Sequence, residues 1–308
     1  MTSSKNKIIV FGGTGHYGRK IVEKLLQKGQ AVKVVSRNGE RARAILGEEV
    51  EIFQGDVCKR ETITGSLKNT AAIVICLSAM SSKLFKRMKQ IERDAVLTII
   101  EEAEKQQISR LVYLSGYEMR EQVLHDLEIP EFGEIKIEIE AKISSTNLNW
   151  TILGCAPSSE IFFAFIRNGK MTVPGGGLNA IPTVAAENVG EITAQAVLRD
   201  DLKGKRIRLT GPEAYSFPEA ARQISILSGK RIKHLAIPLT MIHVVSFLLL
   251  PFFPFVRFIY QSLKLLNHFP RDLAEHVPKD HQTLMELFDY KPVSLEMDIR
   301  KRLEENEF

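Results

Sequence analysis

The sequence has little that would support a disulfide scaffold, a metal site or a secreted protein. It contains three cysteines, Cys58, Cys76 and Cys155, and their spacing forms neither a CxxC motif nor another metal-ligand pattern. The opening residues lack the apolar core of a signal peptide, and a strand-like segment follows them directly. We therefore expect reduced thiols, no metal ligation and a cytoplasmic location.

The sequence also lacks a concentrated charge of either sign. Its net charge of +5 comes from scattered Lys and Arg residues, without a basic arm or aromatic residues interleaved with basic ones. We therefore expect no nucleic-acid partner. The apolar share of 44% and the charged share of 26% are those of an ordinary globular protein, with chain enough for one α/β domain and an appended lobe.

Long apolar runs are missing except in one segment, residues 235–256, which contains no Lys, Arg, Asp or Glu. Prolines divide this segment and leave an uninterrupted run of about a dozen residues, too short to span a bilayer as a helix. Three interpretations stay open. In the first, the segment forms a helical lobe in which Phe252, Phe253 and Phe255 line an apolar substrate pocket. In the second, residues 235–260 make a peripheral membrane contact. In the third, the segment forms a dimer interface. The oligomeric state is left open.

Apolar strand-like segments alternate with amphipathic helical segments through much of the chain. This alternation is typical of βαβ units and of a parallel sheet covered by helices. The expected strands are residues 8–11, 31–35, 50–53, 71–77, 111–114, 150–153 and 206–210. The expected helices are about residues 17–27, 41–46, 84–106, 135–144 and 187–198.

A glycine-rich segment, residues 12–18, joins the first expected strand to the first expected helix. Gly12 permits a sharp turn, Gly15 lets backbone N–H groups approach a pyrophosphate, and Gly18 lets the helix pack closely on the sheet. The alternative is a glycine turn without a ligand, but the strand–turn–helix context favours a dinucleotide cradle. The expected cofactor contacts in this loop are Gly12, Gly13, Thr14, Gly15, His16, Tyr17 and Gly18.

These patterns predict an α/β protein with a doubly wound parallel Rossmann sheet and a smaller, mostly helical C-terminal lobe on the substrate side. We expect the Rossmann domain to comprise residues 1–157, with a returning helix and strand at about residues 183–211. The remaining residues, 212–308 together with 158–182, are expected to form the lobe.

The residues after the second and third expected strands favour NADP(H) over NAD(H). An NAD-selective site places a carboxylate after the second strand, whereas this chain has Arg37, which can pair with a 2′-phosphate. The alternative is a solvated loop arginine. After the third strand, Asp56 either accepts from the adenine amino group, with Val57 packed on the ring, or caps the next helix. Leu77 and Ser78, at the end of the fourth strand, are further expected cofactor contacts.

Several segments spread over most of residues 7–240 resemble the atypical short-chain dehydrogenases/reductases, and within them the NmrA-like group. Besides the glycine loop, these segments are residues 36–37, 55–57, 111–115, 136–140, 150–153 and 204–213. The resemblance implies a Rossmann sheet of about seven strands with NADP(H) at its carboxyl edge. It also implies a small C-terminal lobe over the nicotinamide. The family contains both reductases and non-catalytic NADP(H) sensors.

The same resemblance implies a catalytic Ser, Tyr and Lys, of which this chain keeps two. Ser115 and Lys136 match, but the tyrosine position is Phe132, which has no proton to transfer. The resemblance then leaves Lys136 as the general acid, and we expect desolvation to lower its pKa. A structural Lys136 that touches no ligand is the alternative, and Tyr117 either replaces the missing tyrosine or only packs.

The first functional hypothesis is an NADPH-dependent reductase of an apolar small molecule. The second is a non-catalytic NADP(H)-binding redox sensor or regulator that acts through a protein partner. Phe132 favours the second hypothesis, whereas the aromatic residues between 252 and 255 favour the first. A third hypothesis, a membrane-surface scaffold that retains NADP(H) for stability, depends only on the apolar segment.

Overall fold

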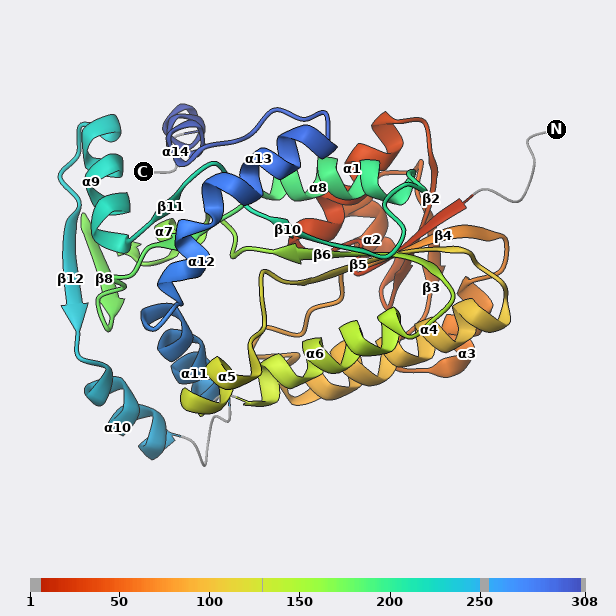
Figure 1. Cartoon of the computed structure of the whole chain (residues 1–308), viewed down its shortest axis with the longest axis horizontal. Coiled ribbons are helices and arrows are strands. Elements are labelled where there is room, and N and C mark those ends of the chain that lie inside the picture. The colour runs from red at the N-terminus through yellow and green to blue at the C-terminus, as the bar shows by residue number, and fades with distance from the viewer. Residues whose placement is uncertain (1–6, 129, 250–254, 306–308) are drawn as a thin grey trace. The chain divides into compact units, whose positions relative to one another are not determined.

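The computed structural model describes residues 7–128, 130–249 and 255–305, which divide into two compact units (Figure 1). Unit 1 contains Met1–Glu121, Pro130–Cys155 and Val189–Arg208. Unit 2 contains Gln122–Ile129, Ala156–Asn188 and Leu209–Phe308.

Unit 1 is built on a seven-stranded sheet. Its strands are β1 (Lys7–Phe11), β2 (Ala31–Ser36), β3 (Glu51–Gln54), β4 (Thr70–Ile75), β5 (Arg110–Gly116), β6 (Asn149–Cys155) and β10 (Lys205–Leu209). Their order is β3-β2-β1-β4-β5-β6-β10, and β1 to β6 pair in parallel. The backbone N–H of Gly204 donates to the carbonyl of Trp150, and that of Ala156 donates to the carbonyl of Leu209. These two hydrogen bonds show that β10 runs parallel to β6. The expected doubly wound Rossmann sheet is confirmed.

Helices cover both faces of this sheet (Figure 1). The helices are α1 (His16–Gln27), α2 (Gly39–Leu46), α3 (Arg60–Ser66), α4 (Ala95–Lys105), α6 (Pro130–Ser144) and α8 (Ala186–Val197). Figure 1 shows α3, α4 and α6 along one face, and α1 and α8 along the other. An ion pair of 2.6 Å between Lys28 and Glu191 links α1 to α8.

The sheet is apolar on both faces because helices bury both of them. Phe11, Ile73 and Tyr113 are at most 1% exposed, and they pack with residues of α4 and α6 in one core cluster. Burying each such side chain contributes roughly 1.5–3 kcal/mol, so this core holds the strand ends in fixed positions. Loops at the carboxyl ends of the strands are therefore presented by a rigid support.

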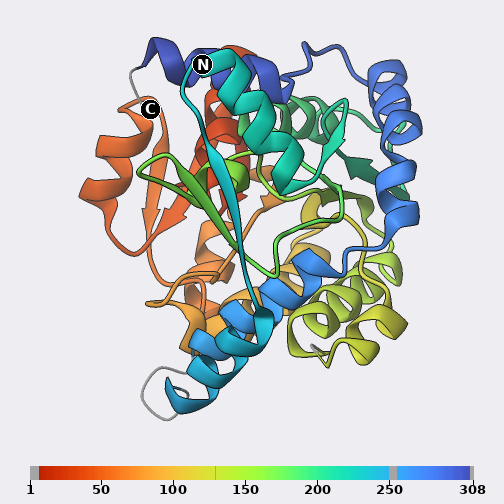
Figure 2. The ribbon, with the colours of Figure 1, turned by 90° about the vertical axis from the view of Figure 1, so that its left-hand side faces the viewer.

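Unit 2 combines short strands with helices. Its strands are β7 (Ile166–Arg167), β8 (Lys170–Pro174), β9 (Ile181–Pro182), β11 (Ala214–Tyr215) and β12 (Lys233–Ile237). Its helices are α5 (Glu121–Asp126), α7 (Ile161–Ala164), α9 (Phe217–Ser228), α10 (Leu239–Leu249), α11 (Phe255–Asn267), α12 (Arg271–Glu275), α13 (Val277–Leu287) and α14 (Leu295–Glu304). In Figure 2, β12 runs alongside β8, with which it pairs in parallel.

Two details of the fold differ from the pattern in the sequence. The segment expected to be one helix, residues 84–106, contains a 3₁₀ turn (η1, Phe85–Arg87) and a π turn (η2, Lys89–Asp94) before α4. The second difference is the three-stranded sheet β12-β8-β7 of unit 2, which the sequence did not indicate. Its strands are two to five residues long, too short for a clear alternation of apolar and polar side chains.

Candidate cofactor and active site

The predicted site residues of unit 1 follow the carboxyl ends of its strands. The chain winds from β1 towards β3 on one side and from β4 towards β10 on the other, so the winding direction changes between β1 and β4. In open α/β sheets, ligands bind in the crevice outside the strand ends at such a point. The glycine loop, Arg37, Asp56, Leu77 and Ser115 come from five successive strands whose ends meet at this edge.

Two glycines of the loop are required by contacts within the protein. Gly12 has φ +91°, and a Cβ built on it would lie 2.5 Å from the carbonyl oxygen of Cys76. A Cβ built on Gly18 would lie 2.1 Å from the carbonyl oxygen of Gly12. Such distances exclude any side chain at either position, so these glycines allow the sharp turn and the close packing of α1 on β1.

Gly15 is placed differently, because it leaves open space in front of α1. It is the N-cap of α1, has no side-chain cap, and donates its N–H to Gly12 O at 2.9 Å. A Cβ built on Gly15 would meet only Gly12 O, at 3.1 Å, and would otherwise point away from the protein. The first turn of α1 contains no acidic residue. A pyrophosphate therefore fits this cradle, held by backbone N–H groups and by the helix dipole.

The other residues of the loop support the cradle. Gly13 is buried, and a Cβ on it would lie 2.7 Å from Val34 of β2. Gly13 therefore serves the packing of the loop on the sheet. Thr14 is half-buried. His16 and Tyr17 are the first two residues of α1, and the centroids of their rings lie 5.0 Å apart. The assignment of these residues as cofactor contacts stays a prediction.

Arg37 lies exposed after β2, next to the start of α2. The side chain of Asn38 caps α2 by accepting from the N–H of Arg41 at 2.9 Å. This turn leaves the Arg37 guanidinium at the sheet edge, where its charge acts on Asp56. Burial would raise the pKa of Asp56, but hydrogen bonds from Cys58 and Arg87, with the charges of Arg87 and Arg37, hold it below its usual range.

Asp56 is engaged in a way that the sequence did not indicate. One carboxylate oxygen accepts from the N–H of Cys58 at 3.0 Å, and the other pairs with Arg87 of η1 at 2.9 Å. The N-cap of α3 is Lys59, so the interpretation of Asp56 as a helix cap is wrong. A cavity of about 380 Å³ adjoins this ion pair, and its lining includes Val57. It is large enough for an adenine ring, so the predicted adenine contact stays open.

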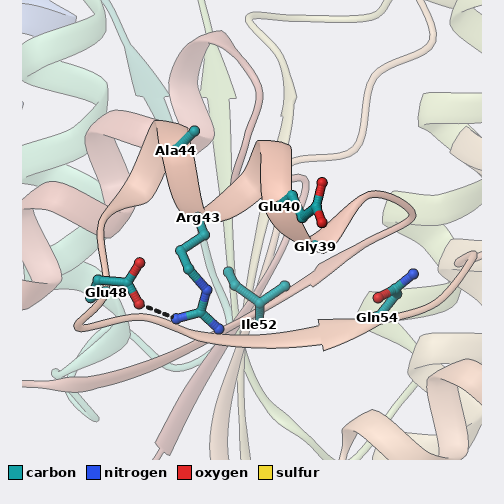
Figure 3. A pocket seen from close by; sticks show the side chains of 7 residues that line it. All are labelled: Gly39, Glu40, Arg43, Ala44, Glu48, Ile52 and Gln54. Atoms are coloured by element: carbon teal, nitrogen blue, oxygen red, sulfur yellow. Dashed lines mark hydrogen bonds and ion pairs between the residues drawn. The ribbon is translucent and has the colours of Figure 1, made fainter.

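A second cavity, of about 510 Å³, lies between α2 and the edge strand β3 (Figure 3). Figure 3 shows Arg43 reaching from α2 to Glu48, with which it forms an ion pair of 2.6 Å, past Ile52 of β3. None of the residues predicted to bind the cofactor lines this cavity. It is therefore distinct from the site at the carboxyl edge.

Lys136 of α6 is 8% exposed and lies in a group of buried polar side chains. Its Nζ is 3.0 Å from a carboxylate oxygen of Glu92 and 3.3 Å from the hydroxyl of Tyr113. Burial alone would lower the pKa of Lys136, but Tyr113 and Glu92 raise it above its ordinary value. The expectation of a lowered pKa is therefore wrong, because the interactions of the ammonium with Tyr113 and Glu92 together outweigh desolvation.

Ser115 is 6% exposed, and its hydroxyl has no hydrogen-bond partner in the described part of the chain. It lies two residues after Tyr113 on β5, hence on the same face of the sheet. A buried hydroxyl without a partner is costly, and a ligand at the strand end would supply the missing bond. This unsatisfied group is a second feature that fits a ligand at this edge.

Leu77, Ser78, Tyr117 and Phe132 are the other residues that the sequence places near the carboxyl edge. Leu77 is half-buried and Ser78 exposed, both directly after β4. Tyr117 is 3% exposed, with its ring 5.8 Å from the Arg208 guanidinium, so it packs on that side chain, and its role as a replacement for the missing tyrosine stays a prediction. Phe132 lies in α6, and its side chain falls outside the described residues.

The described part of the apolar segment, residues 235–249 and 255–256, forms the end of β12, α10 and the start of α11. In α10, Met241, Val244 and Phe247 are 58%, 56% and 71% exposed. Within the described residues, no helix combines the length and the apolarity needed to cross a bilayer. Phe252 and Phe253 lie outside these residues, so the substrate pocket, the peripheral membrane contact and the dimer interface all stay predictions.

Among the described residues, no three or more His, Cys, Asp or Glu side chains are grouped so that they could hold a metal ion.

Comparison with known families supports the assignment of the cradle. An NAD(P)H-binding family matches residues 12–160, which include the glycine loop and most of the sheet. The photosystem II assembly factor Ycf39 of Trieres chinensis is 25% identical over 244 residues, covering 78% of this chain and 74% of that protein.

Two solved structures share the fold over nearly their whole length. The NADPH-dependent quinone oxidoreductase of Escherichia coli, solved with NADPH, has a TM-score of 0.74 at 16% identity, covering 96% of this chain and 99% of that one. The triphenylmethane reductase of Citrobacter sp., solved with NADP(H), has a TM-score of 0.74 at 18% identity, with the same coverage. At these identities the likeness concerns the fold alone.

Proposed function

From the premise that this chain is an NAD(P)-binding protein of the Rossmann fold, we propose that it is an NADPH-dependent reductase of an apolar, conjugated small molecule. The observation that carries the proposal is the buried, unpartnered hydroxyl of Ser115 at the strand edge that also bears the glycine cradle. A substrate atom bound beside the cofactor would supply the missing hydrogen bond.

The proposed preference for NADPH rests on Arg37. An exposed guanidinium after β2 can pair with a 2′-phosphate by two hydrogen bonds, whereas NAD-selective sites place a carboxylate there to accept from the ribose hydroxyls. Arg41, in the first turn of α2, adds a second positive charge nearby. The solved NADPH and NADP(H) complexes of the two structural relatives agree with this preference.

The proposed mechanism assigns binding and orientation, but no proton donation, to the protein. When bound, NADPH supplies a hydride. The backbone around Gly15 would hold the pyrophosphate, and an N–H of Lys136 would hold a cofactor hydroxyl. The hydroxyl of Ser115 would donate to an oxygen or nitrogen of the acceptor. Phe132 has no acidic proton, and the raised pKa of Lys136 keeps its ammonium from giving one up near neutral pH.

This division of labour selects the class of acceptor. A simple ketone needs a proton donor as hydride arrives, because an alkoxide is a strong base. A quinone or an extended conjugated acceptor spreads the negative charge of its reduced form, so water can supply the second proton afterwards. A quinone gains two electrons and one hydrogen from the hydride and one proton from solvent, whereas a cationic dye is neutralised by the hydride itself and takes up no proton. The names of the quinone oxidoreductase and the triphenylmethane reductase fit this class of acceptor.

The second candidate is a non-catalytic NADP(H)-binding regulator that acts through a protein partner. Phe132 in place of the usual tyrosine, together with a lysine whose proton is firmly held, favours it. A relative named as an assembly factor agrees with a role that needs no chemistry.

NADPH oxidation by the whole chain, followed at 340 nm, separates the two candidates. The panel contains quinones, conjugated dyes, enones and simple ketones. The reductase proposal expects turnover of the quinones or dyes but not of the ketones, and loss of that turnover in Gly15→Val. No oxidation with any acceptor, in a protein that binds NADPH, would favour the regulator. A gain of ketone reduction in Phe132→Tyr would identify a degenerate reductase site.

A further inference from the structure

Glu92 is a buried carboxylate whose two oxygens join different parts of the sheet edge. One oxygen accepts from the backbone N–H of Ala79, in the chain after β4, at 2.7 Å. The other lies 3.0 Å from Nζ of Lys136 on α6. Glu92 is 2% exposed. A carboxylate this deeply buried is tolerated only when it is paired and hydrogen-bonded, so the two contacts depend on each other.

The local backbone explains how a glutamate reaches this position. Glu92 lies in the π turn η2, which holds one more residue per turn than an α-helix. Its neighbours Gln90 and Asp94 are exposed, whereas Ile91 and Glu92 face the core. Such turns recur at functional sites because they redirect a side chain without breaking the helix.

Lys136 meets titratable groups from each element packed around it. Glu92 comes from η2 and Tyr113 from β5, and the Lys136 charge also acts on the thiol of Cys155 at the end of β6. The charge of Glu140 acts on Tyr113 from α6 itself. Burial raises the pKa of Tyr113, so its hydroxyl remains neutral and accepts from the ammonium.

These contacts leave part of the lysine's donor capacity for a ligand. An ammonium has three N–H groups, of which Glu92 and Tyr113 take two in the described residues. Because the partners lie on β5 and η2, they fix both the position of Nζ and the direction of the third N–H. The unpartnered hydroxyl of Ser115 lies near the carboxyl end of β5, on the same face of the strand as Tyr113.

We propose that Glu92 is the positioning residue of this site: it holds the Lys136 ammonium in place and links it to the chain after β4. Lys136 then serves as a fixed cation that donates a hydrogen bond, and it keeps its proton throughout turnover. Only the identity of the ligand that Lys136 meets rests on the proposed function; the role of Glu92 is a property of the protein alone.

The first test measures the protonation of Lys136 in the whole chain without cofactor. Lysine side chains labelled with ¹³C are titrated by NMR, and the Lys136 signal is assigned by its loss in Lys136→Met. In the wild type we expect Lys136 to stay protonated to at least about pH 10, close to or above the ordinary lysine value. In Glu92→Gln we expect deprotonation at least roughly 2 pH units lower, because burial then acts without a paired carboxylate.

Matched variants give the specificity of this effect. Asp298→Asn removes another carboxylate of low exposure, 14%, which belongs to unit 2, and should leave the Lys136 titration unchanged. Glu92→Asp keeps the charge and should restore most of the wild-type titration. Deprotonation of wild-type Lys136 below pH 9, or a wild-type titration in Glu92→Gln, would overturn the proposal. If Glu92→Gln does not fold, the wild-type protein still puts the proposal at risk, because deprotonation of Lys136 below pH 9 would contradict a paired ammonium.

A second measurement follows the consequence for the ligand. Calorimetry at pH 7 and pH 9 should give equal NADPH affinities for the wild type at both pH values. Glu92→Gln should bind about tenfold more weakly at pH 7, the effect of one misplaced hydrogen bond, and more weakly still at pH 9 as Lys136 loses its charge. Equal affinities of Glu92→Gln and wild type at both pH values would contradict a positioning role. Failure of every acceptor in the oxidation assay would instead contradict the proposed reductase, and would not alter the NMR result.

Discussion

Lys33 and Lys136 are both buried in unit 1, but the protein satisfies them to different degrees. Lys33 of β2, 4% exposed, donates to the carbonyl oxygens of Ser66 and Lys68 at 3.0 and 2.8 Å. It also lies 3.5 Å from the carboxylate of Glu51. Three acceptors match its three N–H groups, so the surroundings of Lys33 are complete without a ligand.

The surroundings of Lys136 are incomplete by the same count. The described residues provide it with Glu92 and Tyr113 as acceptors, and the Ser115 hydroxyl on the same strand face has no partner. Lys33 occupies the amino half of a strand, whereas Lys136 faces the carboxyl edge of the sheet. The difference teaches that burial of a charged group does not by itself mark a site, whereas an unfilled set of hydrogen bonds at the carboxyl edge fits a bound ligand.

The largest expected effect concerns the glycine cradle. Gly15→Val should lower NADPH affinity by at least about 100-fold, or about 2.8 kcal/mol, since the valine fills the space of the pyrophosphate. The domain should still fold, because the only atom close to the new Cβ is Gly12 O at 3.1 Å. Thermal melts with and without NADPH measure both effects. Stabilisation by NADPH equal to that of the wild type would refute the cradle.

Gly18→Val is the matched control for that variant. Its Cβ would lie 2.1 Å from Gly12 O, so the variant should lose folding stability even without cofactor. A Gly18→Val protein as stable as Gly15→Val would show that the two glycines do not have the separate roles described here.

The comparison of Lys33 with Lys136 is tested most directly by replacing each lysine with methionine. Lys136→Met should weaken NADPH binding roughly 10- to 100-fold, the value of one hydrogen bond from a charged group. Lys33→Met should bind NADPH like the wild type, although it loses stability because the carbonyls of Ser66 and Lys68 lose a donor. Calorimetry and denaturant titration give the two quantities. Equal affinity losses in the two variants would contradict a site at Lys136.

Arg37→Glu should reverse the cofactor preference. In the proposed site the guanidinium would pair with the 2′-phosphate, whereas a glutamate would repel it and accept from ribose hydroxyls instead. We expect a loss of NADPH affinity of about 10- to 100-fold, from removal of a charge-assisted pair, and a smaller gain for NADH. Calorimetry with both cofactors measures the ratio. Equal affinities of the wild-type protein for NADPH and NADH would disprove the preference.

Ser115→Ala has the smallest expected effect on function. It tests whether the unpartnered hydroxyl beside Lys136 contributes to the site. Turnover of a quinone or dye should fall about fivefold to tenfold, the value of one neutral hydrogen bond. The free energy of unfolding without cofactor should rise by about 1 kcal/mol or more, because the variant no longer buries an unpaired hydroxyl. A clear loss of stability with unchanged turnover would assign Ser115 a structural role instead.

Local patterns in the sequence were sufficient for the sheet and the phosphate cradle. The central strands β1 and β4 of unit 1 are apolar segments next to turn residues, and the glycine spacing at residues 12–18 follows directly on the first of them. Contacts between distant residues were not predictable in this way. Arg87 pairs with Asp56 across 31 positions, and no local signal distinguishes that arginine from its neighbours Lys86 and Lys89.

The same limit applies to the protonation of Lys136. The sequence places a lysine four residues after the vacant tyrosine position, and burial by itself predicts a lowered pKa. The fold places Glu92, 44 positions earlier in the chain, at 3.0 Å from that lysine and reverses the direction. The sign of such a shift depends on which charge is nearest, and this is a property of the packed structure alone.

The sequence by itself therefore determined the strand–helix rhythm and the glycine turn between the first strand and the first helix, because these depend on residue types at short spacing. Only the tertiary structure decided that Glu92 and Tyr113 surround Lys136, that Ser115 is left without a partner, and that Asp56 is held by Arg87. These features arise where strand ends and a π turn from separate parts of the chain meet, and the hydrogen bonds formed there depend on three-dimensional distance rather than on sequence spacing.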